Sequence, residues 1–160
     1  MEGTGSLTGR GPPVIAPPPF IFLGTLAVGL VLQMLRPFAL YPHSLVARLV
    51  GVGLVMVGLA LSTAVVLHFR RAETPVTPLR ETQYLVRSGP YRFSRNPDYL
   101  GQALVTGGLA LLLGSGWVLL MLVPALLLVR YRVIAPEERY LEEKFGEEYR
   151  RFRSHVRRWV

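Results

Sequence analysis

The sequence has no cysteine and few charged residues. Without cysteine the chain has no disulfide bonds, no thiolate nucleophile and no thiolate metal site. Charged residues make up 18% of the 160 residues and hydrophobic residues 51%, and the mean hydropathy is +0.36. These values lie at the apolar edge of what soluble domains show, so a soluble globular protein is disfavoured.

The apolar residues occur in long runs. Residues 49–67 contain no charge and are long enough to cross about 30 Å of hydrocarbon. We therefore expect an all-α, polytopic membrane protein with about four transmembrane helices, at residues 20–35, 45–69, 100–113 and 117–129. The residues Gly114, Ser115 and Gly116 between the last two runs predict a tight helical hairpin.

The length favours a single domain. Residues 1–19 are rich in glycine and proline and are predicted to form a flexible tail, and residues 20–160 a single membrane-embedded domain. Small residues at helical spacing, Ala47 with Gly51 and Ala103 with Gly107, predict sites where helix backbones approach closely.

Positive charge is unevenly distributed along the chain. Six Lys and Arg residues lie in the connection 70–98 and nine lie from residue 130 to the end, whereas the first link is flanked only by Arg36 and Arg48. Because Lys and Arg accumulate on the cytoplasmic side, we expect both basic regions and both termini to be cytoplasmic. We attribute the net charge of +8 to arginines that contact membrane lipids, and no nucleic-acid partner is expected.

The C-terminal segment has an amphipathic pattern. Its apolar residues recur every three or four positions and predict one face of a cytoplasmic helix, interrupted at Gly146. These residues are Leu141, Phe145, Tyr149, Phe152, Val156 and Trp159. The opposite face is rich in arginine, which favours contact with an anionic membrane surface or packing over the 70–98 connection.

Polar residues cluster directly before the third apolar run. Asn96 suits an N-cap, Pro97 the first helical position, and Asp98 the positive end of the helix dipole. The neighbouring Arg92, Arg95, Tyr91 and Tyr99 leave two interpretations open. The cluster is either a site for a carboxylate or phosphate, or an anchor to lipid headgroups.

A second polar cluster follows the last apolar run, from Arg130 to Arg139. We expect Pro136 to start a new helix. Glu137 and Glu138 would then lie in its first turn, at the positive end of the helix dipole. The hairpin returns this cluster to the membrane face that holds residues 92–99, so cations, carboxylates and aromatic rings are predicted to converge there.

The ordered set of motifs resembles the isoprenylcysteine carboxyl methyltransferase family, which is related to phospholipid methyltransferases. The resemblance covers about residues 75–159 and rests on motifs on both sides of the hairpin. Many family members have histidine where this chain has Asn96, a residue that hydrogen-bonds but does not titrate. The matching residues are Gly89-Pro90-Tyr91, Arg95-Asn96-Pro97, Tyr99, Gly101, Glu137-Glu138, Leu141, Phe145-Gly146, Glu148-Tyr149 and Val156.

This resemblance implies a membrane methyltransferase that uses S-adenosylmethionine and acts on a lipophilic acceptor. The residues it implies for cofactor binding are Tyr91, Asn96, Pro97, Tyr99, Gly101, Glu137 and Glu138. For catalysis it implies Arg95 or Arg132 to orient an anionic acceptor and Glu138 as base for an amine. Prenylated proteins, isoprenoid acids, phospholipid amines and small apolar molecules all stay open as acceptors.

Two other interpretations are kept beside the methyltransferase. Sterol-type membrane reductases are similar across the C-terminal region, but they usually place an asparagine where this chain has Asp98. A non-catalytic membrane subunit of the same fold is the other alternative. No metal site is expected, because His43, His68 and His155 are widely scattered.

Overall fold

The computed structural model describes residues 17–39, 44–71 and 85–159. Most of the predicted tail 1–19, His43 with the middle of the first link, and part of the 70–98 connection lie outside these residues. The described chain is helical, with no strand, which confirms the predicted all-α fold. Its elements are α1 (Pro18–Leu35), α2 (Leu45–Arg71), the 3-10 turn η1 (Gly89–Arg92), α3 (Pro97–Leu113), α4 (Gly116–Val129), the π-helical segment η2 (Arg130–Ile134), α5 (Ala135–Phe145) and α6 (Glu147–His155).

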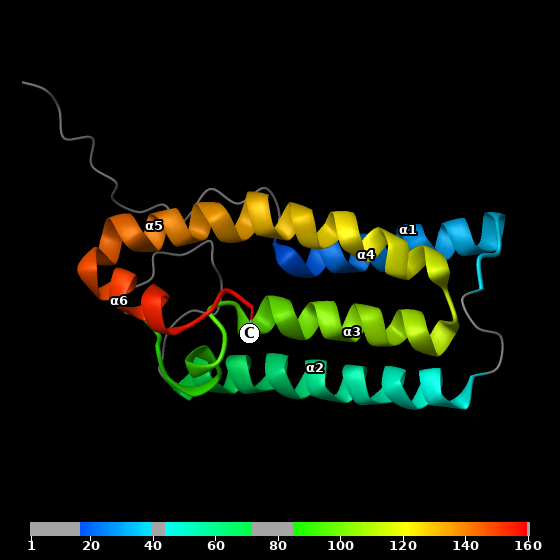
Figure 1. Ribbon diagram of the computed structural model, residues 1–160, viewed down its shortest axis with the longest axis horizontal. Helices are drawn as coiled ribbons and strands as arrows, with labels where there is room; N and C mark the ends of the chain where they lie inside the picture. Colours follow the sequence, from blue (N-terminus) through cyan, green and yellow to red (C-terminus); the bar gives the residue numbers. More distant parts are fainter. Residues whose placement is uncertain (1–16, 40–43, 72–84, 160) are drawn as a thin grey trace, which may run out of the picture.

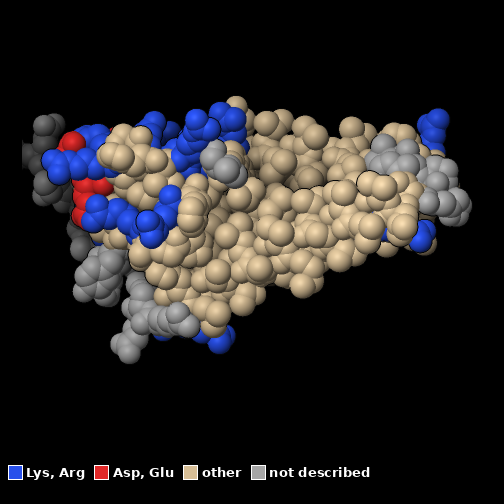
Figure 2. Space-filling view, turned by 60° about the horizontal axis from the view of Figure 1, so that its bottom comes forward, with Lys and Arg blue, Asp and Glu red and all other residues tan. Residues whose placement is uncertain are grey.

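Three helices are long and apolar enough to cross a membrane. They are α1, residues Leu45–Arg70 of α2, and the continuous helix Gly116–Phe145. The fourth long apolar helix, α3, has 17 residues. Figure 2 shows charged side chains gathered mainly at the end of the molecule formed by α5 and α6, while most of the visible face is uncharged. This is the surface of a membrane protein.

The predicted helix start at Pro136 is wrong, because α4, η2 and α5 form one continuous helix of 30 residues. The wider π turn explains how the helix passes this proline. In η2 the backbone N–H of Ala135 donates to the carbonyl of Arg130, five residues earlier. Pro136 has no N–H and its ring would clash with the carbonyl four residues back, so a widened turn accommodates it without a break. The Glu137–Glu138 pair therefore lies inside a helix.

The helices pack in two pairs. Helix α2 lies along α3, and α1 lies along α4, with fewer contacts between α1 and α3 (Figure 1). The predicted hairpin between α3 and α4 is confirmed. Gly114 adopts the left-handed conformation, and the Ser115 side chain accepts a hydrogen bond from the backbone N–H of Val118 to start α4.

Glycines bring α2 and α3 into close contact. A Cβ atom on Gly58 would lie 2.5 Å from the Gly101 carbonyl oxygen, and one on Gly51 would lie 2.9 Å from the Gly108 oxygen. The predicted approach at Gly51 is therefore correct. The prediction for Gly107 is wrong, because a Cβ there would meet only the Leu122 side chain, at 3.6 Å. Gly101 and Gly108 provide the contact from α3 because they face α2.

The C-terminal segment turns back onto the start of α3. The predicted interruption at Gly146 is confirmed, with α5 ending at Phe145 and α6 starting at Glu147. Helix α6 ends at His155 and Val156 is extended, so Val156 and Trp159 do not continue the helical face as predicted. Instead, the backbone N–H of Arg95 donates to the Arg157 carbonyl at 3.0 Å, and Trp159 packs against the buried core. This tertiary contact ends the helix early.

Candidate functional site

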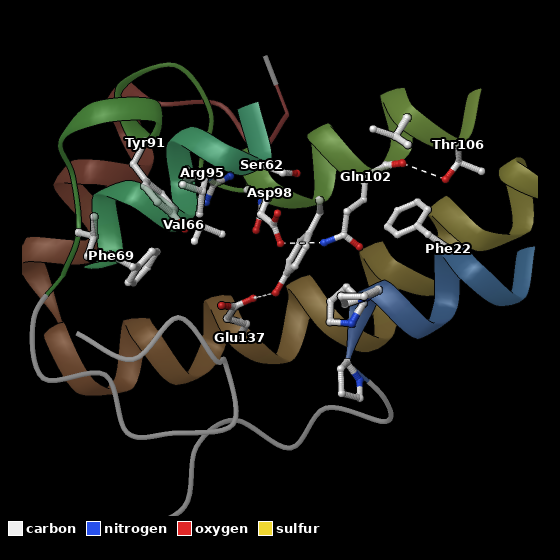
Figure 3. A pocket seen from close by; sticks show the side chains of 18 of the residues that line it. Phe22, Ser62, Val66, Phe69, Tyr91, Arg95, Asp98, Gln102, Thr106 and Glu137 are labelled. Carbon is white, nitrogen blue, oxygen red and sulfur yellow. Dashed lines mark hydrogen bonds between the residues drawn. The ribbon is translucent and has the colours of Figure 1, made fainter. Parts of the chain in front are cut away.

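A cavity of about 720 Å³ lies between the start of α1, the end of α2, α3 and the helix that carries Glu137 (Figure 3). Its volume is within the range of roughly 300–1,000 Å³ typical of small-molecule sites. One part is walled mainly by apolar side chains, namely Phe22, Leu23, Leu26, Leu59, Val105 and Leu109, whereas the apolar Val66 lies beside Arg95 (Figure 3). The other part is walled by polar side chains, among them Tyr91, Arg95, Asn96, Asp98, Tyr99, Gln102, Glu137, Glu138 and Tyr149.

The polar wall begins at the N-terminus of α3. Asn96 is the N-cap, as predicted, and its backbone carbonyl accepts from the Leu100 N–H. Its side chain does not cap the helix, however, because Nδ2 donates to the Arg158 carbonyl at 3.0 Å. Ser94 Oγ donates to the same carbonyl, at 3.3 Å. The asparagine side chain therefore ties the C-terminal segment to the cavity wall.

The predicted convergence of the two polar clusters is confirmed by direct contacts across the hairpin. The Tyr99 hydroxyl donates to Glu137 Oε2 at 3.0 Å, and Arg95 NH1 lies 3.0 Å from Glu138 Oε1. The first contact joins α3 to α5, and the second joins the segment before α3 to the same helix. Carboxylates from α5 and cations from the α3 start thus share one end of the cavity.

Glu138 is enclosed by two arginines. Arg158 Nε donates to Glu138 Oε1 at 3.0 Å, its NH2 group donates to the other carboxylate oxygen, and Arg95 completes the group. Glu138 is 8% exposed, so its charge is compensated by these partners and not by water. The hydrogen bond to Glu138 raises the pKa of the Arg158 guanidinium, which keeps the arginine charged.

Tyrosines extend the polar wall. Arg95 NH1 also donates to the Tyr149 hydroxyl, at 3.4 Å, and burial raises the pKa of that hydroxyl. Tyr91 packs edge-on against Phe69 with ring centroids 5.9 Å apart. Burial, followed by the charges of Glu137 and Asp98, raises the pKa of the Tyr91 hydroxyl. Both tyrosines are therefore neutral at physiological pH and act as donors or as aromatic surfaces.

Two polar atoms in the cavity wall lack a partner. Among the described residues, Arg95 Nε and Gln102 Oε1 are buried without a hydrogen bond. One is a donor and the other an acceptor. Buried polar groups in native proteins are nearly always paired, so these two atoms are exceptions within the described fold. The cavity itself suits a ligand that has both hydrogen-bond acceptors and donors, because a guanidinium, carboxylates and amides line it.

Comparison with known proteins identifies the family. The model of the family described as phospholipid methyltransferase matches residues 46–148, which is more than half of the chain. This chain belongs to the phospholipid methyltransferase family. The match covers α2, α3, the hairpin and α5, the elements that carry most of the cavity. It supports a membrane methyltransferase of the type to which isoprenylcysteine carboxyl methyltransferases belong.

A similar protein occurs in Haemophilus influenzae. It is described as an uncharacterized protein and is 42% identical over 62 residues, which cover 39% of this chain and 98% of that protein. No solved structure matches the chain. The phospholipid methyltransferase assignment therefore rests on the family match, and the site is argued from the residues themselves.

Six of the predicted site residues line the cavity of this phospholipid methyltransferase family member: Tyr91, Arg95, Asn96, Tyr99, Glu137 and Glu138. Two others have packing roles. Pro97 is buried in the first turn of α3, and Gly101 faces α2, where a Cβ would lie 2.6 Å from Ser62 Oγ. Arg132 is exposed on η2 and does not line the cavity.

The sequence interpretation missed Gln102 in the cavity wall and Arg158, the partner of Glu138, and it gave Asp98 another role. Gln102 lies one helical turn after Asp98, where a polar residue in an apolar helix was the available signal. Asp98 was assigned only to the helix dipole, although it lines the cavity and accepts a hydrogen bond from Gln102 Nε2 at 2.7 Å. Arg158 has no comparable signal, because it is one of several arginines in the basic tail.

Proposed function

We propose that this protein is an S-adenosylmethionine-dependent methyltransferase that methylates a lipophilic acceptor at the cytoplasmic membrane face. The single observation that carries this proposal is the two-part cavity. Its polar wall holds the Arg95, Glu137 and Glu138 group, and its apolar wall continues along α3 to Leu109. At about 1.5 Å per residue, the distance from Asp98 to Leu109 is about 16 Å, enough for an alkyl or prenyl chain.

The polar wall fits S-adenosylmethionine chemically. This cofactor carries a carboxylate, an ammonium, a sulfonium, ribose hydroxyls and an adenine ring. The guanidinium of Arg95, which lines the cavity, suits the carboxylate. The carboxylates of Glu137 and Asp98 suit the cationic or hydroxyl groups, and Tyr91 with Phe69 provides an aromatic surface for adenine.

When bound, the cofactor supplies an electrophilic methyl group: the acceptor lone pair bonds to the methyl carbon, and the breaking carbon–sulfur bond leaves its electrons on sulfur. The protein's contribution is positioning, which is worth up to about 7–11 kcal/mol when reacting groups are held close and aligned. Arg95, rather than the exposed Arg132, is the arginine we propose at the site. Because Glu138 is held by two arginines, we propose that it positions Arg95 and does not transfer a proton.

The acceptor is proposed to enter from the bilayer. Helix α1 packs on α4, α2 packs on α3, and side chains from both α1 and α2 line the cavity that α3 shares with them. Apolar residues at the start of α1, such as Phe22 and Leu26, and at the end of α2, such as Val66, therefore line one cavity. An apolar acceptor is expected to pass between these helices without crossing water.

Calorimetric titration of S-adenosylhomocysteine into the detergent-purified protein tests this proposal. We expect saturable binding by the wild-type protein and about tenfold weaker binding by Glu137→Gln, a loss of about 1.4 kcal/mol. Glu142→Gln, five residues further along α5, serves as a matched control and should bind as the wild type does. Absence of binding by wild-type protein with a helical circular dichroism spectrum would contradict the proposal and favour a non-catalytic membrane subunit.

A further inference from the structure

Arg158 in the C-terminal tail is fixed beside the start of α3 by its main chain. Its backbone carbonyl accepts hydrogen bonds from Asn96 Nδ2 at 3.0 Å and from Ser94 Oγ at 3.3 Å. The next residue, Trp159, packs against the buried core. The position of Arg158 is therefore set by tertiary contacts, although the residue lies outside any helix.

The side chain of Arg158 holds both oxygens of the Glu138 carboxylate. Nε donates to Oε1 at 3.0 Å and NH2 donates to Oε2. Such a two-pronged contact fixes the plane of a carboxylate as well as its position. The Arg158 side chain is 26% exposed and that of Glu138 10%, so the arginine is the outer member of the pair. Arg158 is not among the residues that line the cavity.

Glu138 links Arg158 to Arg95, which does line the cavity (Figure 3). Glu138 Oε1, which accepts from Arg158 Nε, also lies 3.0 Å from Arg95 NH1. Because two guanidiniums share one carboxylate, these three side chains carry an excess of positive charge, and Arg95 presents it to the cavity. Without Arg158, Glu138 and Arg95 would form a neutral pair, and the released carboxylate could turn further toward Arg95.

We propose that Arg158 is a positioning residue: by holding Glu138, it keeps the Arg95 guanidinium available for the carboxylate of the bound cofactor. This inference rests on the proposed function, in which Arg95 meets that carboxylate. Because Arg158 acts through Glu138 and Arg95, its loss should weaken recognition of the carboxylate and leave the rest of the ligand unaffected. A residue needed only for folding would weaken all ligands of the cavity alike.

The test uses two ligands that differ in one group. S-adenosylhomocysteine carries the carboxylate, whereas its decarboxylated analogue keeps the adenine, ribose, sulfur and ammonium. In calorimetric titrations of the detergent-purified protein, we expect the wild type to bind S-adenosylhomocysteine about a hundredfold more tightly than the analogue. Arg158→Gln should reduce this ratio about tenfold, with the affinity for the analogue unchanged.

Two further variants distinguish an indirect role from a general loss of charge. Arg157→Gln removes the adjacent, exposed arginine but keeps the backbone carbonyl that accepts from the Arg95 N–H, and it should bind both ligands as the wild type does. Arg95→Gln should lose most of the ratio, and adding Arg158→Gln to it should cause no further loss. A further loss in the double variant would contradict action through Arg95.

The outcomes separate this inference from the proposed function. Failure of S-adenosylhomocysteine to bind the folded wild-type protein would overturn the function itself. Binding of S-adenosylhomocysteine with a ratio that Arg158→Gln leaves unchanged, or with equal affinity of the wild type for the two ligands, would overturn the role of Arg158 alone. If Arg158→Gln does not fold, Arg158→Lys replaces it, because lysine keeps the charge without the two-pronged contact. Its ratio should fall by a smaller factor, and an unchanged ratio would contradict the inference.

Discussion

Glu137 and Glu138 are adjacent in the chain but have different environments. Glu137 accepts a hydrogen bond from Tyr99 and lines the cavity, whereas Glu138 lies between the guanidinium groups of Arg95 and Arg158. Glu138 therefore joins three parts of the chain: α5, the segment before α3 and the C-terminal segment. Its removal should affect the fold before it affects the chemistry.

Glu138→Gln tests this structural role. The substitution leaves two arginines facing a neutral amide in a site that is nearly closed to water, since the side chains of Glu138 and Arg95 are each 10% exposed. Removing one partner of a buried ion pair costs about 3–5 kcal/mol, so the midpoint of thermal unfolding should fall markedly. Glu142→Gln, which breaks the more exposed pair with Arg153, should cost only about 0.2–1 kcal/mol. Equal melting temperatures for the two variants in detergent would contradict the role assigned to Glu138.

Site residues could be predicted from the sequence where they belong to a motif or where the hairpin brings them together. The hairpin glycines placed residues 95–99 beside Glu137 and Glu138, and the structure confirms the contacts between Tyr99 and Glu137 and between Arg95 and Glu138. The partner of a given charge is a property of the tertiary fold. Arg158 is therefore not distinguishable in the sequence from the other arginines of the tail.

At the scale of the elements, the contact between α2 and α3 depends on glycines that face each other. Gly58 and Gly101 meet at one level and Gly51 and Gly108 at another, and in each helix the two glycines are seven residues apart. Seven residues is close to two helical turns, so each pair lies on one face. This contact holds α3, with Asp98 and Gln102, beside the α2 residues that line the cavity.

Two alanine substitutions in α2 separate the contribution of this contact to stability from the effect of helix propensity. Gly58→Ala places a Cβ 2.5 Å from the Gly101 carbonyl oxygen, so the helices must separate, at a cost of about 1–3 kcal/mol. Gly53→Ala places a Cβ where no atom lies within 4 Å, and alanine should stabilise this helix by about 0.5–1 kcal/mol. Unfolding in detergent, followed by circular dichroism, measures both. A Gly58→Ala variant as stable as Gly53→Ala would contradict the close approach.

The elements themselves were predicted more accurately than their junctions. Uncharged runs identified α1, α2, α3 and α4, because length and hydropathy suffice for a membrane helix. The junction at Pro136 was mispredicted because proline is compatible both with the first turn of a helix and with a π turn. The end of α6 was mispredicted because hydrogen bonds to the start of α3, and not periodicity, determine where it stops.

At the scale of the whole molecule, the two ends differ in charge. The end formed by α5, α6 and the start of α3 carries the site and most of the arginines (Figure 2). The opposite end consists of the α3–α4 hairpin and the end of α1, where Ser115 Oγ contacts Gln33 and the Trp117 indole donates to the Arg36 carbonyl. Because an excess of Lys and Arg marks cytoplasmic segments, this asymmetry predicts the orientation of the protein and the side on which the proposed cofactor is bound.

The absence of cysteine makes this orientation measurable with single substitutions. Ser154→Cys places a thiol on the exposed surface of α6, and Pro37→Cys places one at the exposed end of α1. In intact cells, a membrane-impermeant maleimide should label Pro37→Cys and not Ser154→Cys, and in inverted membrane vesicles the pattern should reverse. Labelling of Ser154→Cys from outside would put the site on the face away from the cytoplasm, where S-adenosylmethionine made in the cell is not available. That result would contradict the orientation and leave a methyltransferase with no source of its methyl group.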